Sequence, residues 1–138
     1  MSHRSIVLLL LAGLAAGGCG GPIQPGELRR GAEMVGALAA EGGLLADGAA
    51  RDRTKATFTR VQARTLAAET DHEAEKLADT QAPAGLAGGK QSAVRLAQRV
   101  AGALGDLQVT PGDEAVARTA RDSLRRLSDD ASALARRL

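Results

Sequence analysis

The last third of the sequence carries an apolar stripe that only a helix can bring onto one face. Its members recur every three or four residues without a break: Ala117, Ala120, Leu124, Leu127, Ala131, Leu134 and Leu138. This spacing is typical of an amphipathic helix with coiled-coil-like packing. Thr110, Pro111 and Asp113 precede the stripe in the order of an N-cap, a first helical position and a third helical position. We therefore predict a helix that begins after Thr110 and includes the whole stripe.

Charged side chains on this segment support the prediction of a helix. Residues of opposite charge lie four positions apart, where helical neighbours attract each other. The predicted pairs are Glu114 with Arg118, Asp122 with Arg126, and Arg125 with Asp129. We expect the stripe itself to serve as an interaction face, formed by Leu124, Leu127, Leu134 and Leu138.

Three further helices are predicted from the remaining apolar patterns. The segment from about Lys90 to Asp106 places Ala93, Ala97, Val100, Leu104 and Leu107 on one face. The segment from Glu27 to about Ala46 buries Leu28, Val35 and Leu38, with Gly48 as its terminator. The segment from about Asp52 to Thr80 repeats the rhythm at Phe58, Val61, Thr65, Ala68 and His72. The composition of these segments favours helix throughout, because β-branched runs are missing.

Two connections separate the later helices. Residues 82–89 are rich in proline and glycine, which predicts a loop, and residues 107–111 predict a tight one. Short connections favour antiparallel neighbours, so we expect an all-α, up-down bundle of four helices. A displacement of 66 residues superposes Phe58 on Leu124 and Val61 on Leu127, which suggests two αα-hairpins from a duplication.

The composition limits the core and the classes of partner. Only 23 large apolar residues follow Cys19, with no Trp or Tyr among them, so a partner is expected to contribute burial. Beyond residue 18 the chain has 17 basic and 16 acidic side chains, and this balance provides no broad attraction to nucleic acid. The single cysteine excludes an internal disulfide.

The N-terminal segment has the order of a secretory signal peptide. Arg4 precedes an apolar stretch, Ile6 to Ala16, and the small Gly17 and Gly18 lead to Cys19. This arrangement resembles the signal of bacterial lipoproteins, in which apolar and small residues directly precede a cysteine. The resemblance implies cleavage before Cys19, a diacylglyceryl group on its thiol and frequent acylation of the new N-terminus, with palmitate as an expected fatty acid.

The resemblance also implies a domain organisation and a location. Residues 1–18 are then a signal peptide, residues 19–25 the lipidated cysteine and a flexible tether, and residues 26–138 the helical bundle. The protein is expected in the cell envelope, on the outer leaflet of the cell membrane, or on the outer membrane where the host has two. Two alternatives stay open: ordinary secretion after cleavage at a small residue, and an uncleaved membrane helix.

The only chemically dense patch lies between residues 69 and 76. Glu69 and His72 form Glu-x-x-His, which resembles the ligand element of ferritin-like di-metal bundles. Such bundles need a second copy of the element, and the only other histidine is His3. Glu69, His72 and Glu73 are therefore weak metal candidates, and a solvated acidic helix face is the expected alternative. No serine or cysteine has the setting of a nucleophile, so we predict no cofactor and no enzyme.

These observations predict a membrane-tethered interaction or structural module. Its expected partners are the membrane, through the lipid on Cys19, and an envelope protein or further copies of the chain, without nucleic acid. The alternative is a binding protein that holds a small apolar or lipid ligand between its helices, in space left by Gly31, Gly36 and Gly102.

Overall fold

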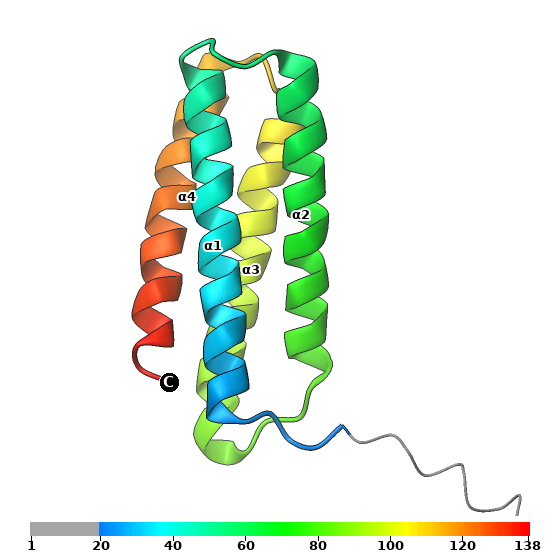
Figure 1. Cartoon of the computed structure of the whole chain (residues 1–138), viewed down its shortest axis with the longest axis vertical. Helices are drawn as coiled ribbons and strands as arrows, with labels where there is room; N and C mark the ends of the chain where they lie inside the picture. Colours follow the sequence, from blue (N-terminus) through cyan, green and yellow to red (C-terminus); the bar gives the residue numbers. More distant parts are fainter. Residues whose placement is uncertain (1–19) are drawn as a thin grey trace, which may run out of the picture.

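The computed structural model describes residues 20–138, in which four helices alternate in direction (Figure 1). They are α1 (Pro25–Ala50), α2 (Ala56–Asp79), α3 (Ala84–Val109) and α4 (Glu114–Ala135). The predicted all-α, up-down bundle is confirmed. The first described residues, the link between α2 and α3 and the C-terminus share one end, which we call the lower end, as drawn in Figure 1. The other two connections form the upper end.

Local hydrogen bonds explain where α1 and α4 begin. The Gln24 N–H donates to the Glu27 carboxylate over 2.9 Å, and Pro25 occupies the first turn of α1. At the start of α4 the Asp113 carboxylate accepts the N–H groups of Ala115 and Val116 at 2.8 and 3.0 Å. Asp113 is therefore the N-cap of α4.

The prediction that Thr110 caps the last helix is wrong. Its hydroxyl donates to the carbonyl of Asp106 over 3.0 Å, so Thr110 ends α3 instead. Pro111 lies between the two helices, and the N-cap moves to the next side chain that has a free acceptor, Asp113.

The predicted loop over residues 82–89 is also wrong for most of its length. Helix α3 begins at Ala84, and only residues 80–83 connect it to α2. Gly89 faces Leu28 and Leu138, and a Cβ there would approach Leu138 Cδ2 to 2.7 Å. Because close packing holds this segment, the weak helix propensity of glycine does not end the helix. Helix α1 likewise passes Gly48, the predicted terminator, and ends at Ala50.

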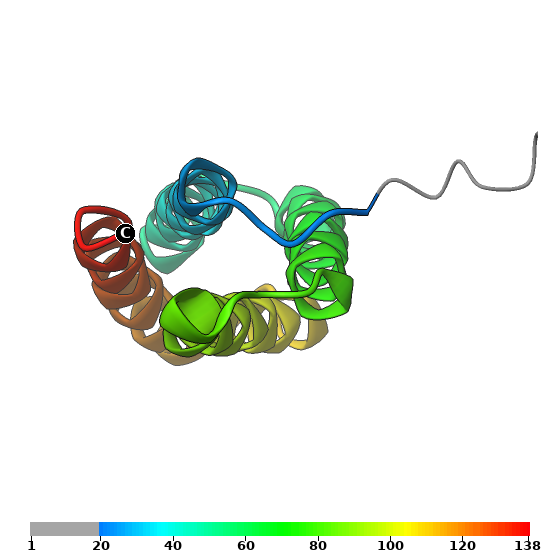
Figure 2. The same ribbon diagram turned by 90° about the horizontal axis from the view of Figure 1, so that it is seen from below.

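The four helices pair unequally around the bundle. Viewed along the axis, they follow one another in a ring (Figure 2). The most extensive packing joins α1 to α4 and α2 to α3, whereas the pairs α1–α2 and α3–α4 touch less. The hairpins α1–α2 and α3–α4, which a duplication would repeat, are therefore not the tightly packed units.

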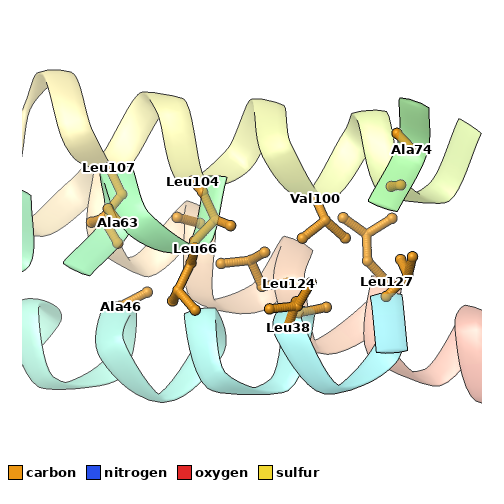
Figure 3. Packing of buried hydrophobic residues seen from close by; sticks show 14 of the residues in the cluster. Leu38, Ala46, Ala63, Leu66, Ala74, Val100, Leu104, Leu107, Leu124 and Leu127 are labelled. Carbon is orange, nitrogen blue, oxygen red and sulfur yellow. The ribbon is translucent and has the colours of Figure 1, made fainter. Parts of the chain in front are cut away.

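The core consists of two apolar clusters that follow each other along the axis. The larger occupies the middle and upper part, where Leu66, Leu104 and Leu124 point between the helices (Figure 3). The smaller closes the lower end and includes Ile23, Leu28, Leu77, Ala93 and Leu134. The predicted core faces of α1, α3 and α4 are confirmed. All their predicted members are buried except Leu138, which is half-buried.

Helix α2 turns a different face inward from the one predicted. Phe58 and Val61 are 52% and 54% exposed, and Thr65, Ala68 and His72 are also exposed. The buried residues of α2 are Thr59, Ala63, Leu66, Thr70, Glu73, Ala74 and Leu77. The 66-residue superposition therefore aligns exposed Phe58 and Val61 with buried Leu124 and Leu127, and its register does not describe a structural repeat.

Hydrogen bonds satisfy the threonine hydroxyls on the inward face of α2. The Thr70 hydroxyl donates to the Leu66 carbonyl over 2.7 Å, and the hydroxyls of Thr59 and Thr54 lie 3.0 Å apart. A buried hydroxyl with a partner avoids most of the desolvation penalty.

Candidate interaction surfaces

Cys19, the predicted lipidation site, lies just outside the described residues. Only four positions later, the chain packs against the bundle. Ile23 is 4% exposed in the lower apolar cluster, and its N–H donates to the Gln81 carbonyl over 2.7 Å. The predicted flexible tether of residues 19–25 is therefore too long, because Ile23 is docked and Pro25 is helical. Within the described residues, the segment before this docking point is Gly20, Gly21 and Pro22.

The charged side chains next to this segment belong to α1 and α2. Glu27, Arg30, Glu73 and Lys76 line one pocket with residues 20–24, whereas the link between α2 and α3 is uncharged. Residues 80–89 contain no charged side chain, and Pro83, Ala84, Gly85 and Ala87 are exposed. The next residue, Lys90, donates to the carbonyls of Ala78 and Thr80 at 2.7 and 2.6 Å. Its ammonium group thus satisfies carbonyl groups left free at the C-terminal end of α2.

Basic side chains lie at the end of α4, at the same lower end of the bundle. Arg136 and Arg137 are exposed there, and the Arg137 guanidinium donates to the Ala133 carbonyl over 3.2 Å.

The metal candidates do not converge. Glu69 and His72 are exposed on α2, whereas Glu73 is buried on the face toward α1. The Glu73 carboxylate lies 3.4 Å from the Lys76 ammonium, and its Oε1 would be 3.3 Å from a Cβ on Gly31. Across residues 20–138, no three His, Cys, Asp or Glu side chains are grouped so that they could hold a metal ion.

The predicted interaction face on the last helix lies inside the bundle. Leu124, Leu127 and Leu134 are 0%, 1% and 7% exposed, and half-buried Leu138 packs against the lower cluster. These leucines are core residues, so the prediction that they form an exposed interaction face is wrong. Within the chain, α4 packs against α1 and α3.

Neighbouring helices come close to two of the three glycines that were expected to leave space. A Cβ on Gly31 would meet Leu77 Cδ2 at 2.8 Å, and one on Gly36 would meet the Ala131 Cβ at 3.3 Å. The Ser128 hydroxyl also donates to the Gly36 carbonyl over 3.0 Å, directly across the contact between α4 and α1. These glycines allow close helix approach, and exposed Gly102 faces open space. Gly31 also lines an open pocket of about 660 Å³ between α1 and α2, together with Met34 and Leu77.

Ionic contacts join α1 and α4 on the outside. The Asp47 carboxylate lies 3.1 Å from Arg51, 3.6 Å from Arg121 and 3.8 Å from Arg125. Arg121 also donates to the Asp122 carboxylate over 2.8 Å, and this hydrogen bond lowers the pKa of Asp122 and raises that of Arg121.

Only part of the predicted ion pairing on α4 is present. The pair Glu114–Arg118 is confirmed at 3.9 Å. Asp122 contacts Arg121, and Arg125 contacts Asp47, in place of the predicted partners Arg126 and Asp129. Only the contacts of Asp47 with Arg121 and Arg125 join two helices, because the other two pairs lie within α4.

An exposed stripe of three apolar and two polar residues on the outer face of α2 was assigned to the core by its spacing in the sequence. We call it the α2 stripe, and it consists of Phe58, Val61, Thr65, Ala68 and His72. The Thr65 hydroxyl donates to the Val61 carbonyl over 3.1 Å, so its polar group is already satisfied. The spacing of the stripe was visible in the sequence, but its exposure was not, because it depends on which face α2 turns inward.

No helix within residues 20–138 has a stretch both long and apolar enough to span a bilayer. No protein-family model, curated protein or solved structure matches the chain.

Proposed function

We propose that the protein is a lipid-anchored module of the bacterial cell envelope that acts by protein contact without catalysis. The observation that carries the proposal is the docking of Ile23, which brings the chain to the lower end only a few residues after Cys19. A cysteine at the end of a signal-like segment, followed almost at once by a folded domain, suits a protein held directly at a membrane.

The short connection gives the anchored domain a defined orientation. Three extended residues span at most about 10 Å, so the lower end lies at the lipid surface. Its uncharged residues 80–89 suit that position, and Arg136 and Arg137 are placed to meet anionic headgroups. A helix of 26 residues is about 39 Å long, so the upper end stands well clear of the membrane.

The proposed mode of action is supported by how the polar side chains are used. Asp47 and Glu73 are engaged in contacts within the bundle, and Glu69 and His72 have no third ligand within residues 20–138. The largest exposed apolar side chain of the described chain, Phe58, lies on an outer helix face. A surface of this kind is suited to another protein rather than to a small substrate.

Replacement of the anchor residue tests the proposal. Cys19→Ser should move the protein from the membrane pellet and the detergent phase to the soluble fraction, and should abolish incorporation of a labelled fatty acid. Two or three acyl chains hold a protein firmly, so the shift should be nearly complete. Gly21→Ser is the matched control and should remain membrane-bound. Unchanged partitioning of Cys19→Ser would contradict the anchor.

A further inference from the structure

The α2 stripe has the geometry of a coiled-coil seam that no other element of the described chain covers. Its members follow at intervals of three, four, three and four residues, which places them along one line on the helix. The core-facing residues of α2 begin one position later, at Thr59. Helix α2 thus presents one seam to the bundle and a second seam outward.

We propose that a second copy of this chain covers the α2 stripe, so that two parallel α2 helices pair about a two-fold axis perpendicular to the membrane. The inference rests on the proposed function, because the common anchor sets the direction of the helices. In each copy the C-terminal end of α2 lies at the lower end, next to the residues that follow Cys19. Two copies anchored in one leaflet therefore present α2 in the same direction.

The charges beside the stripe match this parallel arrangement. Arg64 and Asp71 lie along one flank of the stripe, and Glu69 and Lys76 lie along the other, all exposed. In a parallel pair, a residue on the first flank faces the residue five positions later on the opposite helix. Arg64 then faces Glu69 of the second copy, and Asp71 faces Lys76, whose ammonium also lies 3.4 Å from Glu73 of its own helix. Because of the two-fold symmetry, each of these pairs is present twice.

The second copy also explains the position of Phe58. In the parallel register each residue of the stripe meets the same residue of the second copy. The exposed Phe58 and Val61 side chains are therefore buried against Phe58 and Val61 of that copy, at the upper part of α2. Five side chains make a small interface compared with those of dimers that are stable in dilute solution. Confinement to one membrane raises the effective concentration, so the anchored protein is the state that pairs.

Cysteine crosslinking tests the pairing in the anchored protein. The full chain with Val61→Cys carries one thiol besides Cys19, which the lipid occupies. Mild oxidation of the membrane fraction should convert most of this variant to a covalent dimer. Leu44→Cys, on α1 and 73% exposed, is the control and should stay largely monomeric. Equal crosslinking of the two variants would overturn the proposal.

The same variant distinguishes parallel from antiparallel pairing. An antiparallel pair with the same seam would set Val61 opposite Ala68, about 10 Å along the helix from the other Val61. A disulfide needs Cα atoms within about 7 Å, so only the parallel pair joins Val61→Cys to itself. A variant that pellets with the membrane but does not crosslink would refute the pairing and leave the anchor standing. A variant absent from the pellet would refute both.

Charge reversal provides an independent test of the register. Adding Arg64→Glu to Val61→Cys places two glutamates across the seam and should lower the crosslinked fraction several-fold. Adding Glu69→Arg as well restores opposite charges and should restore the yield. Arg64 and Glu69 are five positions apart in one helix and do not pair with each other there. Rescue would therefore identify a contact between copies, and a yield unaffected by Arg64→Glu would overturn the register.

Discussion

Helices α2 and α4 carry apolar stripes with the same alternating interval of three and four residues, yet the fold buries one and exposes the other. On α4, Leu124 and Leu127 are completely enclosed, whereas on α2 Phe58 and Val61 keep about half of their surface in contact with solvent. Spacing determines which residues share a face of a helix. Which face becomes the core depends on what the neighbouring helices offer to pack against it.

The composition of the two helices explains the difference. Helix α4 has one apolar face and a strongly polar opposite face, so only one orientation buries leucine. Helix α2 has two half-apolar faces side by side, and the inward one contains Leu66 and Leu77 together with small residues. Leucine and alanine fit beside the closely packed α1 and α3, and a phenylalanine at the same place would separate the helices.

The largest effect that tests this contrast is expected from truncating one residue of each stripe. Leu124→Ala removes a fully buried side chain and should lower the free energy of unfolding by about 3 kcal/mol. Phe58→Ala should lower it by less than about 1 kcal/mol, because the ring is half exposed. Denaturant titration of both variants checks the difference. A larger loss from Phe58→Ala than from Leu124→Ala would show that α2 turns its other face inward.

Glycine substitutions should sharpen the contrast between buried and open helix faces. A Cβ on Gly42 would lie 2.7 Å from Leu104 Cδ2 and 3.2 Å from Leu124 Cδ1, both in the core. Gly42→Ala should therefore destabilise the bundle by about 1 kcal/mol, since overpacking exceeds the gain in helix propensity. Gly102→Ala meets nothing within 4 Å and should stabilise it by about 0.5–1 kcal/mol. Thermal unfolding of both variants should give shifts of opposite sign.

The smallest expected effect concerns the polar side of α4. The hydrogen bond from Arg121 holds the pKa of Asp122 below its ordinary value of 3.8, so the ionised carboxylate favours the folded state. This contribution is present above about pH 4 and is lost as the pH falls through the lowered pKa. Asp122→Asn should therefore be slightly less stable than the wild type at pH 7 and equal to it near pH 2.

The exposed position of Asp122 keeps this effect small, because solvent screens the pair. Thermal unfolding of wild type and Asp122→Asn between pH 2 and pH 7 measures it. A stability difference that grows as the pH falls would contradict the assignment.

Three core faces were predictable because several large apolar residues of each helix recur at helical spacing. Val35 and Leu38 on α1, and Val100 and Leu104 on α3, are examples. The extension of α3 back to Ala84 was not predictable, because glycine disfavours helix and only Gly89 of this segment packs against Leu28 and Leu138. The extension of α1 beyond Gly48 was likewise not predictable.

The candidate surfaces also divide into features that the sequence predicts and features that only the structure shows. The prediction of a signal peptide that ends at Cys19 depends on the local order of residues alone. The docking of Ile23 against Gln81 joins residues 58 positions apart, and no local pattern indicates it. That contact shortens the free segment after Cys19 and so turns a general expectation of membrane tethering into a specific orientation.

By itself, the sequence determined the number and type of the helices and the apolar faces of α1, α3 and α4, because these follow from propensity and periodicity within one segment. Only the tertiary structure decided that α2 buries threonines and exposes Phe58, and that the leucines of α4 are core rather than interface. These outcomes depend on how four helices share a limited volume, and such competition between faces is settled only when all of them pack together.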